Sequence, residues 1–320
     1  MQQPDYVSSA ACEQVLTADR ALHLAELAFL WEARGQVDYP NPRALRMRSE
    51  GHPLRFHSKA VALPEIGVAG CRIVGYPVAA DGRRPGADLA TRMIVLMDLE
   101  TGVPLAIVDE HYNYSLRTAA SVAVAAARLA RTPGRLGIVG AGTVATSAVT
   151  ALLAAMPVMD VTLTSRTIER SETLAGLARS LTDAEVRVVP DISTLMEECD
   201  VIVTATTARE PIIRGPLPRG MLMCALGSNE LDAEAYLSCD RLFVDDWAQT
   251  QEAADIVTLI AGGCPIEERL AGELPGLIAG TIPGRRDDDE TIIVRTEGLA
   301  SQDVLFAHWA WQESKAREGA

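Results

Sequence analysis

The chain has 320 residues, enough for two domains with separate cores, and its 48% hydrophobic content is typical of a globular protein. A formal net charge of −14 at pH 7 argues against nucleic-acid binding, which relies on Lys and Arg neutralising phosphates. No apolar run reaches the roughly 18 residues of a membrane span, and the N-terminus lacks a secretion signal. The six scattered cysteines show neither metal-ligand nor disulfide spacing, so we expect a cytoplasmic protein that binds neither membrane nor metal.

The first hundred residues predict a helix followed by a sheet. From Thr17 to Gly35, apolar residues recur at helical spacing, and these two residues are typical start and stop signals. Between residues 43 and 110, short apolar segments are separated by Gly, Pro and Asp. The last two segments flank "ETG", which is typical of a hairpin turn. We therefore expect a mostly antiparallel sheet in this region.

A different pattern begins after residue 115. "SLRTAASVAVAAARLARTPG" predicts a long helix that ends at a domain hinge marked by Pro133 and Gly134. Beyond it, strands such as "RLGIVG", "DVTLT" and "DVIVTAT" alternate with helices. This spacing predicts an α/β domain with a doubly wound parallel sheet, the Rossmann type of fold.

A glycine-rich turn joins the first strand of this domain to its first helix. In "GIVGAGTVA", Gly140, Gly142 and Ala145 fit the G-x-G-x-x-A pattern of dinucleotide-binding proteins. Gly140 permits the tight turn, Gly142 leaves room for a pyrophosphate, and small Ala145 lets the helix pack closely. The N–H groups at the helix start, from Thr143 and Val144 onwards, would then meet the pyrophosphate.

The residues after the second strand bear on the choice of cofactor. An acidic side chain there would bind the ribose 2′-hydroxyl of NAD and repel the 2′-phosphate of NADP. Asp160 has the expected spacing from the glycine turn, but it precedes strand 161–164 and so belongs to the wrong end of the sheet. Ser165, Arg166 and Thr167 follow that strand, and a guanidinium with two hydroxyls suits a phosphate. The turn favours NADP(H) over NAD(H), unless Arg166 stacks on adenine or points to water.

Several segments together resemble the ornithine cyclodeaminase and mu-crystallin family. They are "NPRAL", "LMDLETGVPLAIVD", "SLRTAAS", "GIVGAGTVA", "CDVIVTATTAREPII", "ALGSN" and "EGLASQD", in the family's order over residues 42–315. The resemblance implies a Rossmann domain (117–295) and a discontinuous α+β domain (1–116 and 296–320) for substrate binding and homodimerisation. It also implies that the last strand, "TIIVRTEG", and the helix after it return to the discontinuous domain.

The same resemblance implies how substrate and cofactor are bound. Family substrates are amino acids or their imine or keto counterparts, held by basic side chains. Arg117 of "SLRTAAS" and Arg43 of "NPRAL" match the family's carboxylate ligands. Beyond the glycine turn and residues 165–167, the residues expected at the cofactor are Thr204, Ala205, Thr206, Gly227 and Gly298.

This chain departs from the family at two positions. Where the family often has a lysine stands Arg72, which can hold a carboxylate but is a poor proton donor because its pKa exceeds about 12. Lys59 is the candidate for the missing amine; it would share a strand face with Arg55 and His57, although that face could equally be solvent-exposed. Near Asn229, cyclodeaminases carry an aspartate that acts as general base. Asn229 cannot ionise, although it could hydrogen-bond substrate or nicotinamide.

We therefore predict an NADP(H)-dependent oxidoreductase, with NAD(H) remaining open, that acts on the C–N bond of a small amino acid, imine or ketimine. Arg43, Arg72 and Arg117 would fix the substrate carboxylate, and Lys59 or a water would handle the proton. Two alternatives stay open. One is an ornithine- or lysine-type cyclodeaminase that retains NAD, and the other is a mu-crystallin-like protein that binds a small ligand with NADPH without turnover.

Overall fold

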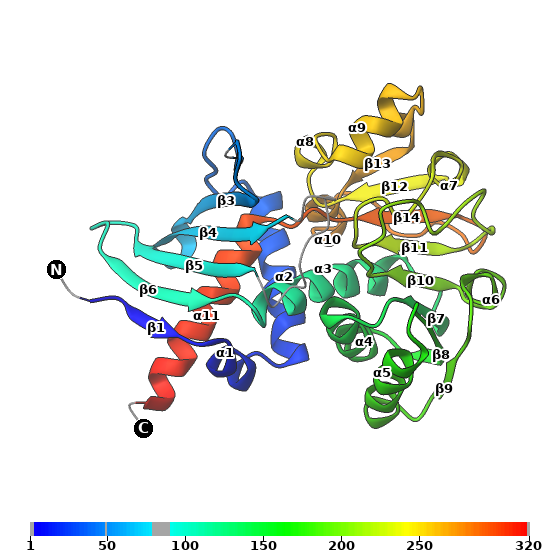
Figure 1. The fold of residues 1–320 in the computed structure, drawn as a ribbon, viewed down its shortest axis with the longest axis horizontal. Coiled ribbons are helices and arrows are strands. Elements are labelled where there is room, and N and C mark those ends of the chain that lie inside the picture. The colour runs from blue at the N-terminus through cyan, green and yellow to red at the C-terminus, as the bar shows by residue number, and fades with distance from the viewer. Residues whose placement is uncertain (1–2, 49, 79–89, 319–320) are drawn as a thin grey trace. The chain divides into compact units, whose positions relative to one another are not determined.

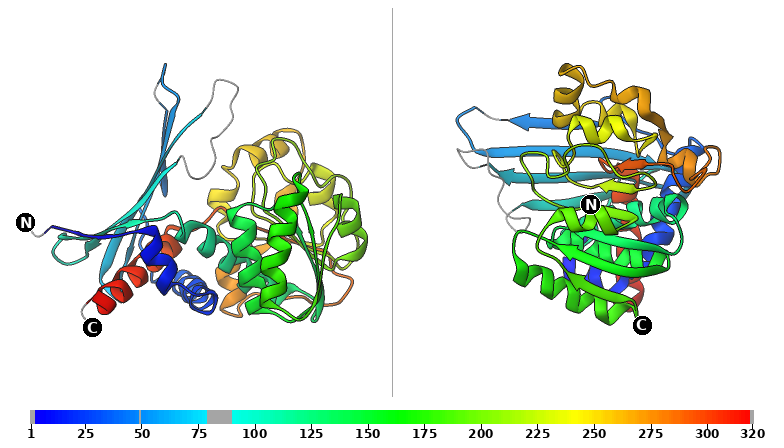
Figure 2. Two further views of the ribbon diagram at one scale, coloured as in Figure 1. Left: turned by 60° about the horizontal axis from the view of Figure 1, so that its bottom comes forward. Right: turned by 90° about the vertical axis from the view of Figure 1, so that its right-hand side faces the viewer.

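The computed structural model describes residues 3–48, 50–78 and 90–318. They form two compact units, shown in Figures 1 and 2. The first unit consists of Met1–Arg117 and Leu299–Ala320, and the second of Thr118–Gly298. Within the described ranges, no helix has both the length and the apolar character that crossing a membrane would require.

The first unit contains a six-stranded sheet. Its strands lie in the order β1, β6, β5, β4, β3, β2, with β1 parallel to β6 and the other pairs antiparallel. They are β1 (Asp5–Val7), β2 (Ala44–Arg48), β3 (Leu54–Leu63), β4 (Val68–Pro77), β5 (Thr91–Asp98) and β6 (Pro104–Asp109). The predicted antiparallel sheet and its hairpin at "ETG" are confirmed. The sequence did not indicate β1, because three residues are too few to show an alternating pattern.

Helix α11 (Ala300–Glu318) packs along one face of this sheet, against β3, β4 and β5. Helices α1 (Ser9–Val15) and α2 (Ala18–Ala33) pack in turn on α11. The predicted start of α2 is confirmed, because the Thr17 hydroxyl accepts a hydrogen bond from the Arg20 N–H at 3.3 Å. A Cβ added at Gly70 would lie 2.6 Å from the Val304 side chain, so glycine there allows α11 to approach β4.

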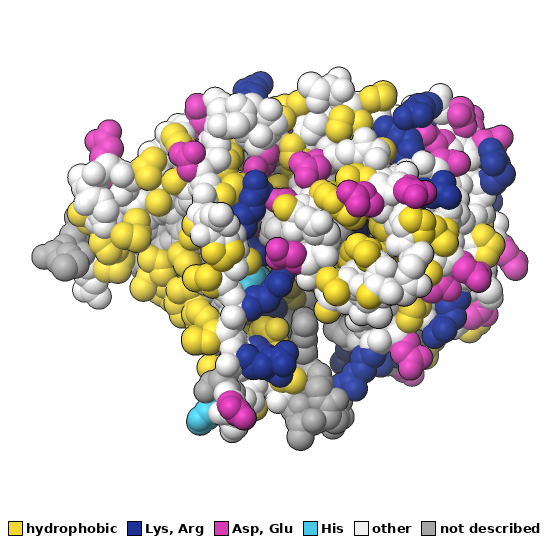
Figure 3. Space-filling model, turned by 90° about the horizontal axis from the view of Figure 1, so that it is seen from above, with side chains coloured by type: hydrophobic (Ala, Val, Ile, Leu, Met, Phe, Trp, Pro, Cys, Tyr) yellow, Lys and Arg dark blue, Asp and Glu magenta, His cyan; other side chains and the backbone are white. Residues whose placement is uncertain are grey.

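The two faces of the sheet differ in burial. The face under α11, here called the inner face, carries fully buried side chains such as Ile94, Leu96 and Val108. The opposite, outer face carries large exposed hydrophobic side chains, between 38% and 69% accessible: Tyr6, Leu45, Met47, Leu54 and Met97. Hydrophobic side chains gather over this unit on the left of Figure 3.

The second unit is built on an eight-stranded sheet in which every pair of neighbouring strands is parallel. The spatial order is β13, β12, β14, β11, β10, β7, β8, β9. The chain runs outward from β7 to β9, then returns to β10 and runs the other way, which is the doubly wound arrangement predicted. The strands are β7 (Gly134–Val139), β8 (Val158–Thr164), β9 (Glu185–Val188), β10 (Val201–Thr204), β11 (Leu222–Ala225), β12 (Arg241–Val244), β13 (Leu270–Glu273) and β14 (Ile292–Arg295).

Helix α3 (Asn113–Leu129) contains the boundary between the two units. The remaining helices of the second unit are α4 (Thr143–Ala155), α5 (Ile168–Leu181), α6 (Ile192–Glu198), α7 (Ala233–Ser238), α8 (Trp247–Thr250), α9 (Ala254–Ala261) and α10 (Leu274–Ile278). Asp232 caps α7 as its position suggested, accepting a hydrogen bond from the Ala235 N–H at 2.8 Å.

The expected placement of the last strand was wrong. Strand β14 does not return to the first unit but lies between β11 and β12 in the parallel sheet. Its residues Ile292, Ile293 and Val294 are fully buried, as is usual for a strand covered on both faces. Only the helix that follows, α11, belongs to the first unit.

Candidate functional site

The glycine turn lies between β7 and α4. Gly140 has a φ of 118°, and a Cβ added there would stand 2.4 Å from the carbonyl oxygen of Ala205, so only glycine fits. Gly142 is the N-cap of α4, and because glycine has no side chain, no side-chain hydrogen bond caps the helix. A Cβ added to Gly142 would meet nothing within 4 Å. The first turn of α4, with Thr143 and Val144, therefore keeps unbonded N–H groups beside open space. Both features fit the pyrophosphate of a dinucleotide.

A buried carboxylate ties together the two loops beside this turn. Glu230 is fully buried and accepts four hydrogen bonds. The donors are the Thr204 hydroxyl (2.7 Å), the Thr206 N–H and hydroxyl (2.7 and 2.8 Å) and the Gly227 N–H (2.7 Å). Because Thr204 ends β10 and Gly227 follows β11, Glu230 fixes the carboxyl ends of two neighbouring strands, the edge where ligands collect in such sheets. No local pattern in the sequence indicates this role.

The role predicted for Thr204 differs from the one that the structure shows. We expected it to contact the cofactor, but it is fully buried and its hydroxyl is used by Glu230. Its role is to support the loop from inside. The next residue, Ala205, turns its carbonyl toward Gly140, and Thr206 is only partly buried. Their predicted contact with the cofactor stays a prediction.

The turn after β8 presents an exposed arginine. The Ser165 hydroxyl is engaged within the turn, 2.7 Å from the Ser171 hydroxyl and 2.9 Å from the Thr167 carbonyl oxygen. Arg166 is exposed and makes no hydrogen bond or ion pair with any residue that the structure describes. Asp160 lies inside β8, which begins earlier than predicted, and pairs in register with Arg135 at the start of β7. That end of the sheet is opposite the glycine turn, as predicted.

Two further candidates in the second unit are held through their backbones. Asn229 has a φ of 59°, a left-handed conformation, and its N–H donates to Asp255 at 2.9 Å. Gly298 has a φ of 83°, and its N–H donates to the buried Asp245 at 2.6 Å. Carboxylates thus fix both backbone turns, and no local pattern in the sequence indicates a role for Asp245 or Asp255.

In the first unit, five charged side chains form a buried ionic cluster: Lys59, Arg72, Glu110, Arg117 and Asp303. Each is at most 8% exposed. Lys59 on β3 and Arg72 on β4 are direct cross-strand neighbours on the inner face. Three cations against two carboxylates leave one positive charge in excess. Within the described residues, no group of His, Cys, Asp and Glu side chains could hold a metal ion.

Asp303 lies between two guanidinium groups of the cluster. Its Oδ1 is 2.8 Å from Nε of Arg117, and its Oδ2 is 3.5 Å from Nε of Arg72. Arg72 Nε also donates to Glu110 Oε1 at 2.5 Å. Burial raises the pKa of Asp303, but attraction to Arg117 and Arg72 outweighs it and lowers that pKa below its ordinary value. For Glu110 burial dominates and raises the pKa.

Arg43 lies outside the buried cluster. It is exposed, and its guanidinium stands 4.3 Å from the centre of the Tyr39 ring. The Tyr39 hydroxyl donates to Glu32 at 2.5 Å and lies 3.2 Å from the Ser301 hydroxyl, so the ring that supports Arg43 is anchored to α2 and α11. Arg43 immediately precedes Ala44, which pairs with Lys59. Arg43 is thus adjacent in the chain to the cross-strand partner of Lys59.

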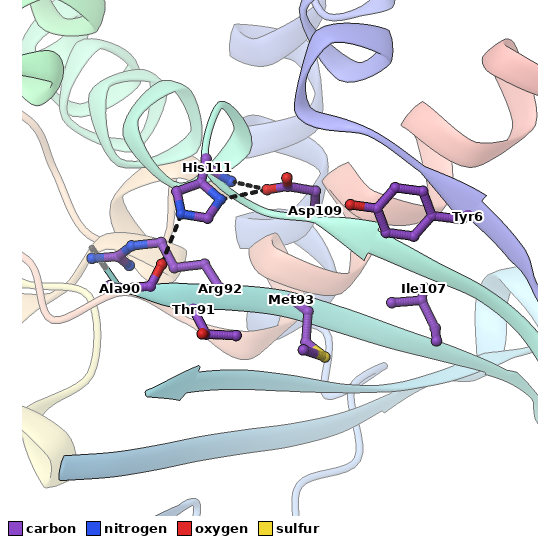
Figure 4. A pocket seen from close by; sticks show the side chains of 8 residues that line it. All are labelled: Tyr6, Ala90, Thr91, Arg92, Met93, Ile107, Asp109 and His111. Atoms are coloured by element: carbon purple, nitrogen blue, oxygen red, sulfur yellow. Dashed lines mark hydrogen bonds and ion pairs between the residues drawn. The ribbon is translucent and has the colours of Figure 1, made fainter. Parts of the chain in front are cut away.

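A cavity of about 410 Å³ opens on the outer face of the same unit. Figure 4 shows its eight lining residues: Tyr6, Ala90, Thr91, Arg92, Met93, Ile107, Asp109 and His111. The His111 ring is held at both nitrogens, by Asp109 (2.6 Å) and the Ala90 carbonyl (2.8 Å). None of the site residues predicted from the sequence lines it.

Known proteins match this architecture along its whole length. The model of the ornithine cyclodeaminase/mu-crystallin family matches residues 4–318. The chain belongs to this family. The resemblance carried by "SLRTAAS", the glycine turn and "EGLASQD" is thereby confirmed.

Three solved structures of similar proteins span both kinds of family chemistry. An archaeal alanine dehydrogenase dimer with bound NAD is 26% identical, with a TM-score of 0.87 over 98% of this chain and 97% of that one. The iminosuccinate reductase of Paracoccus denitrificans in complex with NAD⁺ is 25% identical, with a TM-score of 0.85 over 99% and 98%. A probable ornithine cyclodeaminase from Bordetella pertussis Tohama I is 25% identical, with a TM-score of 0.87 over 99% of both chains. The choice among these activities therefore depends on the site residues.

Proposed function

We propose that this family member is a nicotinamide-dependent oxidoreductase that acts on the C–N bond of a small amino acid or its imine. The buried cluster of the first unit carries the proposal, because its cations outnumber its carboxylates. A substrate carboxylate would balance the excess charge. The glycine turn of the second unit fits a dinucleotide, whose nicotinamide supplies or accepts the hydride. The dehydrogenase and the reductase named above support the same reading.

The cationic side chains take different parts in this proposal. Arg72 and Arg117, with Arg43 beside them, bind a group of the substrate that does not react, so they act by orienting it. Arginine stays protonated and is unsuited to proton transfer. We therefore assign the proton to Lys59 or to a water that it orients. Asn229 cannot ionise, which weighs against the cyclodeaminase alternative.

An assay with the purified protein tests the proposal. NADPH or NADH should be oxidised in the presence of cyclic imino acids, or of 2-oxo acids supplied with ammonia or methylamine. If no member of the panel causes oxidation, the proposal fails. Ammonia release from ornithine or lysine without net cofactor turnover would establish a cyclodeaminase instead, and ligand binding without any product would establish a mu-crystallin-like binding protein.

The exposed Arg166 leads to a further proposal, a preference for NADPH. Replacing Arg166 with Asp should lower the ratio of kcat/KM for NADPH to that for NADH by about 10- to 100-fold, the equivalent of one charged hydrogen bond. Two of the similar structures hold NAD, so this preference would distinguish the present chain from them. Steady-state kinetics with both cofactors gives the ratio.

Arg219→Asp is the matched control for that measurement. It makes the same change of charge, its side chain is 75% exposed, and it precedes β11 at the opposite end of the sheet. The control should keep the cofactor ratio of the unmodified protein. An unchanged ratio in the Arg166 variant would show that this turn does not contact the 2′-phosphate.

We also propose that the protein is a homodimer formed through the outer face of the first unit. Uncovered apolar side chains on a broad sheet face are typical of an interaction surface. A second copy is the occupant we favour, since the similar archaeal alanine dehydrogenase is a dimer. Sedimentation velocity at micromolar concentration should give the mass of two chains. The mass of a single chain would contradict the proposal.

A further inference from the structure

The inner face of the first unit carries more cations than the buried cluster contains. Strands β2 and β3 run antiparallel there, with Arg46 opposite His57 and Arg48 opposite Arg55. Along β3, His57 stands two residues from Lys59, so its side chain points to the same face. The basic surface therefore continues from the cluster along two adjacent strands.

Among the described residues, these additional arginines have no acidic partners. Arg46, Arg48 and Arg55 make no ion pair or side-chain hydrogen bond with the part of the chain that the structure describes. The two carboxylates of this region, Glu110 and Asp303, are already engaged by Arg72 and Arg117. In a chain with a formal net charge of −14, three arginines on one strand pair without an acidic partner among the described residues create a local positive potential that suits an anionic ligand.

The lowered pKa of His57 indicates a positive electrostatic potential at this surface. Burial lowers its pKa, and repulsion from Lys59, Arg72 and Arg46 lowers it further, to about 4. At neutral pH the ring is therefore uncharged and can donate one hydrogen bond. The position between Lys59 and Arg46 thus combines a positive potential with a neutral donor.

We infer that the substrate carries a second carboxylate, bound by Arg46 and His57, in addition to the one bound by Arg72 and Arg117. This inference rests on the proposed function. Arg46 lies opposite His57, one strand step of about 6.5 Å from the pair formed by Lys59 and Arg72. The carboxylate carbons of an extended four- or five-carbon dicarboxylate lie about 4–5 Å apart, and the flexible side chain of Arg46 can cover the remaining distance. The substrate class is an amino dicarboxylic acid or the imine of a 2-oxo dicarboxylic acid.

Paired substrates test the inference. With NADPH and ammonia, kcat/KM should be at least about tenfold higher for oxaloacetate than for pyruvate, and for 2-oxoglutarate than for 2-oxobutyrate. If kcat/KM is the same for monocarboxylic and dicarboxylic oxo acids, the inference of a second carboxylate fails while the proposed function stands. If no oxo acid of either class is reduced, the proposed function fails and the inference fails with it.

A variant of Arg46 and a binding measurement test whether Arg46 causes the preference for dicarboxylic substrates. Arg46→Gln should lower the ratio of dicarboxylic to monocarboxylic kcat/KM by about tenfold. Isothermal titration calorimetry with succinate and propionate, neither of which can be reduced, should show the same loss of preference for the dicarboxylate. Arg34→Gln, at the exposed end of α2 in the same unit, is the control and should keep the original ratio. Unchanged ratios in the Arg46 variant would overturn the assignment.

Discussion

Replacing Glu230 with alanine is expected to lower the free energy of unfolding by about 3–5 kcal/mol. The substitution leaves two N–H groups and two hydroxyls of residues 204, 206 and 227 without their acceptor in a buried loop junction. Each unsatisfied buried group costs about 1–3 kcal/mol, and entry of water would recover part of the sum. Denaturant-induced unfolding, followed by far-UV circular dichroism, measures the difference.

The same variant should weaken cofactor binding. The Ala205 carbonyl rests against Gly140, so a loosened loop at residues 204–206 would no longer define the glycine turn. We expect a raised KM for the nicotinamide cofactor, with a smaller change in kcat. Glu230→Gln keeps the size of the side chain but turns an NH₂ group toward donors, so it should show an intermediate loss.

Glu234→Gln on α7 is the matched control for both Glu230 variants. It lies four residues away, is exposed, and should unfold at the same denaturant concentration as the unmodified protein. If Glu230→Ala also unfolds at that concentration, Glu230 does not hold the two loops together.

Local signals explain what the sequence predicted correctly. The parallel sheet follows from the alternation of strands and helices. The glycine turn was found because Gly140 and Gly142 stand directly between a strand and a helix. The end of the sheet at which Arg166 lies follows from strand direction alone. Each of these inferences needs information from only a few neighbouring residues.

Contacts between distant segments explain what the sequence could not supply. Glu110 and Asp303 lie 193 positions apart in number, yet both engage Arg72, and no local pattern links them. Strand β14 was misplaced because a short apolar run fits either sheet. Thr204 follows a strand as a cofactor ligand would, but its burial depends on Glu230 in a different loop. Buried charge pairing is therefore the part of this site that required the structure.

Replacing Asp303 with asparagine is expected to cost about 3–5 kcal/mol of stability at neutral pH, because it breaks a buried ionic pairing while leaving Arg72 and Arg117 charged. The variant keeps the shape of the side chain, so the loss reports its charge. Chemical denaturation at neutral pH measures it. Asp19→Asn, exposed in the first turn of α2, is the control and should change stability by no more than about 1 kcal/mol.

The stability lost in Asp303→Asn should depend on pH in one direction. The pKa of Asp303 is lower in the folded protein than in the unfolded chain, so its ionised form stabilises the fold above the unfolded pKa of about 3.9. That contribution disappears as the pH falls through the folded pKa, whereas asparagine does not titrate. Glu110 has a raised pKa, but it is present in both proteins and its effect largely cancels in the difference.

The stability gap between the unmodified protein and Asp303→Asn should therefore be constant near neutral pH and shrink as the solution becomes acidic. A gap that widened on acidification would mean that Asp303 is protonated in the folded protein at neutral pH. It would then carry no charge between Arg72 and Arg117, and the cluster would hold a larger positive excess than proposed. A gap that shrinks supports the ionised Asp303 as the fixed anion that holds both arginines in place for a substrate carboxylate.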